Sequence, residues 1–134
     1  MSGESSLHSS LVERLIAVVR SRHSAPRGML VLADHHDFGD DRPPQIGGFT
    51  PDVFACDVPE TFRVLGEAKT PGDLESDRSL RQIAAFLDHL SLRAPSTLYV
   101  AVPWRFVPRA QGIVRSLRRE SHARVHVHVI ADIG

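Results

Sequence analysis

The sequence contains one cysteine and one lysine, Cys56 and Lys69. A single cysteine excludes an internal disulfide and any zinc site built on several thiolates, and it is typical of a reducing compartment. No run of apolar residues approaches the ~18 that a membrane-spanning helix needs. Residues 1–10 also lack the basic-then-apolar layout of a secretory signal. These absences favour a cytoplasmic protein without a membrane partner.

The remaining composition indicates one globular domain over residues 1–134. The length, with 42% hydrophobic and 24% charged residues, is that of an ordinary single domain. The formal net charge is zero, but residues 34–77 hold eleven acidic and three basic residues, whereas residues 78–134 hold nine arginines and three acidic residues. This separation fits carboxylates gathered for a metal and cations gathered for phosphate, or simply two solvated faces.

Hydrophobic periodicity predicts three helices and five strands. The helices are expected at residues 7–22, 74–91 and about 106–119. The strands are expected at residues 29–34, 51–58, 62–69, 97–102 and 123–131. A long polar loop should cover residues 35–48, and Asp73 is the expected N-cap of the second helix. The order αβββαβαβ, with a hairpin and strand–helix–strand crossovers, predicts an α/β fold whose mixed central sheet is flanked by helices.

The residues with the clearest chemistry stand at the ends of the expected hairpin strands. Glu67 and Lys69 lie two residues apart and therefore share one face of a strand, while Ala68 between them can offer its carbonyl. Hairpin pairing would place Asp52 beside them. Two carboxylates and a carbonyl are suitable ligands for Mg²⁺, and a neighbouring lysine can orient a metal-bound water or neutralise a phosphoryl group. The alternative is an ion pair between Glu67 and Lys69 on an exposed strand.

The string IGGFTPDVFACDVPETFRVLGEAKT, residues 46–70, resembles the core of the PD-(D/E)xK nuclease superfamily. The signature of that superfamily is Pro-Asp, a hairpin and then (Asp/Glu)-x-Lys, carried on the second and third strands of an αβββαβ core. The resemblance spans residues 7–103 and implies a restriction-endonuclease-like fold, here extended by a C-terminal helix and strand. It implies that Asp52, Glu67 and the Ala68 carbonyl bind Mg²⁺ or Mn²⁺, and that Lys69 is the catalytic lysine.

Two further site residues follow from the same resemblance. Many members carry a glutamate on the first helix, where Glu13 is the acidic residue available as a metal ligand, although Ser10-x-x-Glu13 also fits a capping box. The segment from Gln82 to Phe86 resembles the Gln-x-x-x-Tyr element of RecB-like members, with phenylalanine in place of tyrosine. Gln82 is therefore an expected active-site group, and a solvated surface glutamine is the alternative.

Other polar clusters have simpler interpretations. The group His35-His36-Asp37 offers metal-ligand atoms, but it lies in the expected loop and is interpreted as solvated. His126 and His128 should share the exposed face of the last strand, and Cys56 should be a small buried residue. Four arginines are the expected nucleic-acid contacts, three of them on one face of the last helix: Arg78, Arg115, Arg118 and Arg119.

The sequence thus predicts a metal-dependent nuclease whose substrate is nucleic acid, with DNA favoured over RNA. Because the chain is close to the minimum for this fold, it is expected to form a homodimer, to read substrate shape or to work with a targeting partner. One alternative is a catalytically silent module that keeps the nuclease fold and serves as a nucleic-acid-binding or scaffold subunit. Another is a hydrolase of small phosphoesters, which the arginine-rich C-terminal third disfavours.

Overall fold

The computed structural model of the protein describes residues 3–23, 28–93 and 95–133. Its elements are α1 (Gly3–Arg22), β1 (Met29–Ala33), η1 (His36–Phe38), β2 (Val53–Asp57), β3 (Arg63–Ala68), α2 (Asp77–Ser91), β4 (Ser96–Val102), η2 (Trp104–Phe106), α3 (Val107–Leu117), η3 (Glu120–His122) and β5 (Val125–Ala131). The predicted order of helices and strands is confirmed, and three short 3₁₀ helices are added to it. Among the described helices, none is long and apolar enough to cross a membrane.

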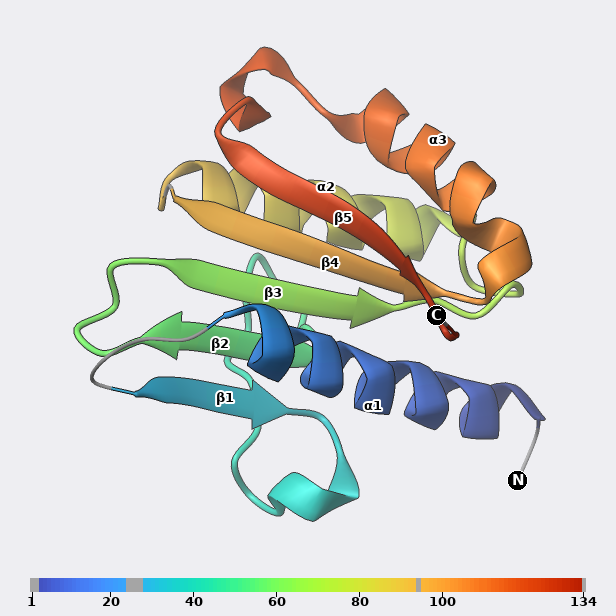
Figure 1. Ribbon diagram of the computed structural model, residues 1–134. Coiled ribbons are helices and arrows are strands. Elements are labelled where there is room, and N and C mark those ends of the chain that lie inside the picture. Colours follow the sequence, from blue (N-terminus) through green and yellow to red (C-terminus); the bar gives the residue numbers. More distant parts are fainter. Residues whose placement is uncertain (1–2, 24–27, 94, 134) are drawn as a thin grey trace.

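The five strands form one mixed sheet in the order β1-β2-β3-β4-β5 (Figure 1). The first three strands are antiparallel neighbours, whereas β3, β4 and β5 are parallel. This follows from the connections, because a short turn joins β2 to β3, while α2 and α3 provide the crossovers that parallel strands require. The predicted hairpin and the predicted mixed sheet are both confirmed.

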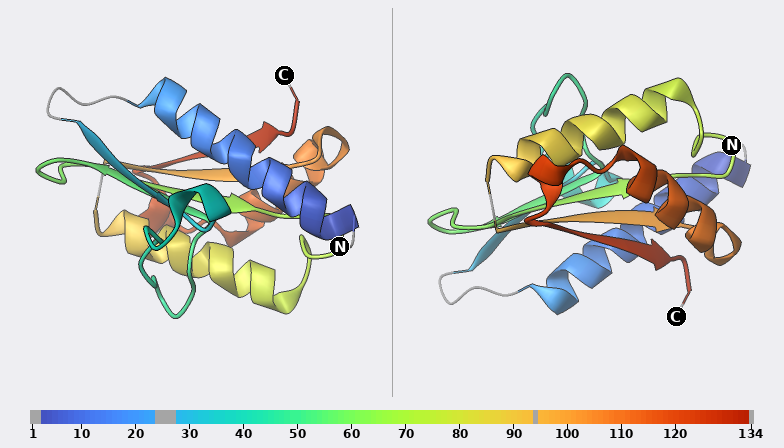
Figure 2. Two further views of the ribbon diagram at one scale, coloured as in Figure 1. Left: turned by 90° about the horizontal axis from the view of Figure 1, so that it is seen from below. Right: turned by 90° about the horizontal axis from the view of Figure 1, so that it is seen from above.

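Helices cover both faces of the sheet: α1 lies on one face, and α2 and α3 lie on the other (Figure 2). Leu11, Leu15 and Val19 of α1 share one apolar cluster with the sheet. Ile83 and Phe86 of α2 belong to a second cluster on the opposite face. Strands β3 and β4 are covered on both faces, so their central residues are mostly apolar. The charged residues of the site lie at the strand ends.

Gly66 lies where Leu15 of α1 packs against β3. A Cβ atom there would lie 3.2 Å from the Val53 Cβ and 3.3 Å from the Leu15 Cδ2. We expect Gly66→Val to lower the free energy of unfolding by about 1–3 kcal/mol, because the added methyls overpack this contact. Urea denaturation would measure the change. A variant as stable as the wild type would contradict this packing.

Gly112 provides the matched control for this substitution. It lies inside α3, and a Cβ atom there would meet no heavy atom within 4 Å. Gly112→Ala should therefore raise the free energy of unfolding, by about 0.5–1 kcal/mol, through the lower backbone entropy of alanine in the unfolded chain.

The predicted start of α2 and the predicted end of α3 are wrong. The N-cap of α2 is Ser76, whose Oγ accepts the Ser79 N–H at 3.1 Å, rather than Asp73. Helix α3 ends at Leu117, so the predicted common helical face of Arg115, Arg118 and Arg119 does not exist. Arg118 instead has extended backbone and donates through Nη2 to the carbonyls of His122 and Val125. These two hydrogen bonds stabilise the connection from α3 to β5.

Candidate active site

The candidate site lies where the start of β2 meets the end of β3. Val53 pairs with Gly66, so continuing the antiparallel register by one residue places Asp52 opposite Glu67. Lys69 directly follows β3, and its N–H donates to the Ala101 carbonyl of β4 at 2.9 Å. The hairpin thus brings together Asp52, Glu67 and Lys69, which are separated by up to 17 positions in the chain.

These side chains are buried. The exposed fractions are 6% for Asp52, 4% for Glu67, 2% for Lys69 and 7% for Gln82. The alternative of an ion pair on an exposed strand is therefore wrong, and so is the alternative of a solvated Gln82. Charged residues are almost never buried to this degree unless they are paired, because each loses its hydration. The site holds three such residues, and Glu67 contacts both Asp52 and Lys69.

Lys69 is held by three oxygen atoms. Its Nζ donates to Gln82 Oε1 at 2.6 Å and lies 3.5 Å from both Glu67 Oε1 and Asp73 Oδ2. An ammonium group has three donors, so the three acceptors fix its position. Asp73 has a side chain that is 51% exposed, and of these partners it is the one that water or substrate could replace. Gln82 reaches Lys69 from α2.

The carboxylates of Asp52 and Glu67 both lie between the start of β2 and the end of β3. Asp52 Oδ2 accepts the N–H of Ala68 at 2.8 Å, and the Asp52 N–H donates to Glu67 Oε2 at 3.3 Å. Because the N–H and C=O of one strand residue point to the same side, the Ala68 carbonyl also points toward the β2 side of β3. Two carboxylates and one carbonyl are therefore close together at the junction of β2 and β3. These three groups form a donor set suited to a hard divalent cation.

The electrostatics of the site also favour a bound cation. Burial, followed by repulsion from the Asp52 carboxylate, raises the pKa of Glu67 well above its ordinary value of 4.5. The Lys69 ammonium opposes this shift without cancelling it. When Glu67 is ionised, two adjacent carboxylates with one lysine leave an excess of negative charge in a buried place. A divalent cation at this edge would neutralise that excess, so the residues present fit such a group.

Replacing Glu67 by glutamine should stabilise the metal-free protein at neutral and alkaline pH. Between pH 4.5 and the raised pKa, the unfolded chain has lost the Glu67 proton while the folded chain retains it. The wild type therefore loses free energy of unfolding as the pH rises through this window, and the stability is fully present only below it. Glu67→Gln has no such titration, so its advantage in EDTA should be larger at pH 8 than at pH 5, as urea denaturation would show. An advantage that shrinks with rising pH would contradict this account.

Among the α1 side chains that the structure describes, His8 contacts the site, and it was not among the residues expected from the sequence. His8 Nε2 lies 3.4 Å from Asp52 Oδ1, and this contact raises the pKa of His8 although partial burial opposes it. One signal was available: His8 extends the inward stripe of Leu11 and Leu15 by one turn. A polar residue on an apolar helix face is an indication of a site.

Glu13 is placed elsewhere. Five residues from His8 correspond to about 140° around a helix, and the Glu13 side chain is 59% exposed. Its Oε1 lies 3.1 Å from His35 Nε2, and none of its contacts within the described residues is with Asp52, Glu67 or Lys69. The capping-box alternative is wrong, because α1 begins at Gly3 and Ser10 lies inside it.

The group His35-His36-Asp37 lies beside Glu13 and is a second arrangement of metal-ligand atoms. One ligand atom from each residue lies within 4.8 Å of the others. The interpretation of this segment as solvated is wrong for His35, whose side chain is 3% exposed. His35 Nδ1 accepts the Asp37 N–H at 3.2 Å, and Nε2 contacts Glu13. A metal at this group would have to displace one of these partners.

The predicted nucleic-acid contacts are spread over the surface. Arg78 is exposed on α2, one helical turn before Gln82, with its guanidinium over the Phe49 ring at 5.4 Å from the ring centroid. Arg115 and Arg119 are also exposed, whereas Arg118 is committed to main-chain carbonyls. Of the four, Arg78 is the one that the helix spacing places beside the site.

Comparisons with protein-family models, with curated protein sequences and with solved structures give no match to this chain.

Proposed function

We propose that this protein is a metal-dependent nuclease of the PD-(D/E)xK type. The observation that carries the proposal is the buried contact of Asp52 and Glu67 with each other and of Glu67 with Lys69, at the junction of β2 and β3. Burying three ionisable groups is costly unless they are used together. The order of α1, β1, β2, β3, α2 and β4 also follows the αβββαβ core of that superfamily, which supports the assignment.

In this proposal Asp52, Glu67 and the Ala68 carbonyl hold Mg²⁺ or Mn²⁺. Such a cation, when bound, polarises the scissile phosphate and lowers the pKa of a coordinated water. Lys69 orients the attacking water and offsets the negative charge that develops on the phosphate. Gln82 positions Lys69 through the 2.6 Å hydrogen bond. Glu13 is left outside the metal shell, since its carboxylate contacts His35.

A polymeric nucleic acid is the substrate that the charge distribution favours. Arg78 is exposed one turn from Gln82 and is placed to bind a backbone phosphate near the site. Nine of the chain's fifteen arginines lie in residues 78–134. A small phosphoester would need no such cationic surface. DNA is the favoured substrate, and the cleavage test below separates it from RNA.

The proposal is tested by a cleavage panel of linear and circular duplex DNA, single-stranded DNA, a branched junction and RNA. Each substrate is incubated with Mg²⁺, Mn²⁺ or EDTA. We expect cleavage of at least one DNA substrate with metal and none with EDTA. Tight DNA binding without cleavage under any condition would instead support the silent nuclease-fold module. Turnover of a chromogenic phosphodiester without DNA affinity would support a small-molecule hydrolase.

A further inference from the structure

We propose that the outer edge of β5 binds an extended, acidic peptide segment of a partner protein, which adds to the sheet as a sixth strand. This inference concerns a surface away from Asp52 and Glu67 and does not rest on the nuclease activity. It starts from the topology: β5 is the last strand of the sheet, and no other described strand pairs with its outer side.

The edge of β5 is open at its centre and closed at its ends. The Asp132 N–H donates to the Val102 carbonyl of β4, so the alternate residues 125, 127, 129 and 131 direct their main-chain groups outward. Arg118 Nη2 donates to the Val125 carbonyl at 2.8 Å, and Arg14 Nε donates to the Ala131 carbonyl at 3.3 Å. Outside β4, no described residue forms a hydrogen bond with Val127 or Val129. These two residues therefore form a window with two outward donors and two outward acceptors.

This edge lacks the features that usually protect an exposed strand. Edge strands are commonly short or carry lysine, proline or inward-pointing charges. Strand β5 is seven residues long, VHVHVIA, and contains neither proline nor a residue that is charged at neutral pH when histidine is neutral. At the opposite edge of the sheet β1 has five residues, and the Ala33 N–H at its end bonds the Asp41 carbonyl at 3.4 Å. The longer and less protected edge is the one suited to strand addition.

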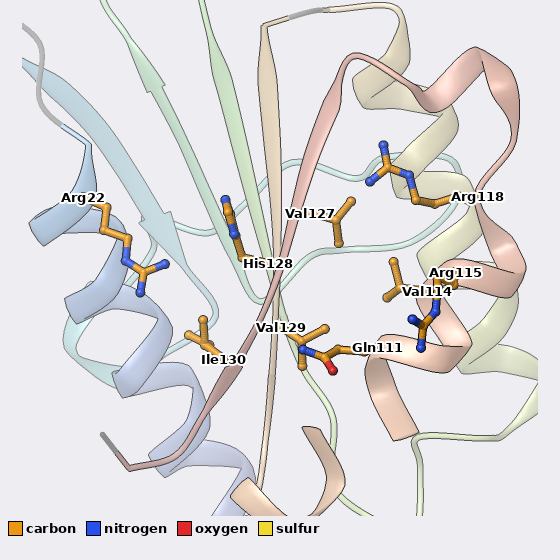
Figure 3. A pocket seen from close by; sticks show the side chains of 9 residues that line it. All are labelled: Arg22, Gln111, Val114, Arg115, Arg118, Val127, His128, Val129 and Ile130. Carbon is orange, nitrogen blue, oxygen red and sulfur yellow. The ribbon is translucent and has the colours of Figure 1, made fainter. Parts of the chain in front are cut away.

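A groove of about 590 Å³ follows this edge (Figure 3). Arg22 of α1 lies on one side of β5, and Arg115 and Arg118 lie on the other, with Val127 and Val129 along the strand between them. The described residues that line the groove include these three arginines and no carboxylate. A strand added here would alternate its side chains between the two faces, so carboxylates on either face would meet an arginine.

The chemistry of the window distinguishes a peptide from the other possible occupants. Nucleic-acid phosphates only accept hydrogen bonds, so they would leave the Val127 and Val129 carbonyls without donors. A second copy of this chain could supply both donors and acceptors. Antiparallel pairing of two β5 strands, however, would bring one set of three arginines against the other, and like charges across a strand pair are destabilising. An acidic peptide satisfies both the main-chain groups and the charge.

The experiment measures binding of a fluorescein-labelled peptide, Glu-Glu-Val-Val-Glu-Glu, to the full chain by fluorescence anisotropy. The control peptides are Lys-Lys-Val-Val-Lys-Lys and the acidic peptide N-methylated at both valines. We expect each control to bind at least about tenfold more weakly, because one loses the charge match and the other loses the main-chain donors. Equal binding of the acidic and basic peptides, or of the N-methylated peptide, would overturn the proposal.

Two variants locate the site. Val129→Pro removes an outward N–H while keeping the β4 ladder, since proline is tolerated where the N–H of an edge strand faces solvent. It should weaken acidic-peptide binding at least about tenfold, whereas Val129→Thr, which keeps the N–H, should not. Arg22→Glu should weaken acidic-peptide binding and strengthen basic-peptide binding. Acidic-peptide binding that is unchanged in both Val129→Pro and Arg22→Glu would overturn the assignment.

Two measurements on the wild type keep the proposal testable if Val129→Pro does not fold. The acidic peptide should shift the amide resonances of Val127 and Val129 in a ¹H–¹⁵N spectrum, and shifts confined to other residues would contradict the proposed site. Light scattering should show a monomer at the peptide-binding concentration. A dimer whose formation the acidic peptide does not inhibit, with Val127 and Val129 protected from hydrogen exchange, would make a second copy the occupant and overturn the proposal.

Discussion

Replacing Lys69 by methionine should lower the rate of metal-dependent DNA cleavage by on the order of 10²–10³-fold, the usual cost of removing a preorganised group that stabilises developing charge. Methionine has nearly the length of the lysine chain without its ammonium, and the Lys69 side chain lies in a buried position. The variant should therefore fold, lose the contact with Gln82 and retain metal binding by Asp52 and Glu67. A gel-based cleavage assay on the preferred DNA substrate measures the effect.

The controls separate a catalytic role from a general loss of positive charge. Arg81→Met removes an exposed cation from α2 and should leave the cleavage rate unchanged. Lys69→Arg keeps the charge but replaces a compact ammonium by a planar guanidinium, which does not fit among Gln82, Glu67 and Asp73. It should therefore fail to restore activity. Cleavage by Lys69→Met at the wild-type rate, in a preparation purified in the same way, would mean that Lys69 is not catalytic or that the activity belongs to a contaminant.

Replacing Asp52 by asparagine should weaken binding of Mg²⁺ or Mn²⁺ by at least about 100-fold. Removing a group that only orients a metal ligand already costs 10–100-fold in metal affinity, and Asp52 is proposed as a ligand itself. Asparagine retains an oxygen that can accept the Ala68 N–H, so the local main chain should be preserved. In the wild type, added metal should raise the melting temperature, because it binds the folded chain alone. The rise should disappear in Asp52→Asn, together with cleavage.

The control for this variant is Asp37→Asn, which alters the group beside Glu13 instead. If the metal binds at Asp52 and Glu67, Asp37→Asn should keep the full metal-induced rise in melting temperature. A rise that is lost in Asp37→Asn and kept in Asp52→Asn would place the metal at His35-His36-Asp37 and would contradict the proposed site.

The sequence was sufficient to predict the sheet and the main residues brought together at its edge. The alternation of a strand places Glu67 and Lys69 on one face, and hairpin pairing brings Asp52 opposite Glu67, although residues 58–62 connect the two strands where the sequence predicted a turn of residues 59–61. These strand rules are local, and the structure follows them, whereas Gln82 was expected from the resemblance of residues 82–86 to the Gln-x-x-x-Tyr element.

The contacts that the sequence analysis missed depend on tertiary geometry. His8 lies within the expected first helix, and it reaches Asp52 because α1 packs across the sheet beside Gly66, a placement that the periodicity of the helix alone does not determine. Asp73 contacts Lys69 because the N-cap lies at Ser76, three residues later than expected. Helix α3 ends at Leu117, where Arg118 bonds carbonyls beyond the helix. The His8 contact is long-range, whereas the Asp73 and Arg118 contacts span four to seven residues and depend on where the adjoining helix begins or ends.

The most direct test of the central claim is to locate the bound cation in crystals of the protein grown with Mn²⁺, by anomalous scattering. The account predicts a peak at the edge shared by β2 and β3, coordinated by Asp52, Glu67 and the Ala68 carbonyl. The same peak should be absent from crystals of Asp52→Asn grown with Mn²⁺. A Mn²⁺ ion at His35-His36-Asp37, or no ion beside Asp52 at saturating Mn²⁺, would contradict the account.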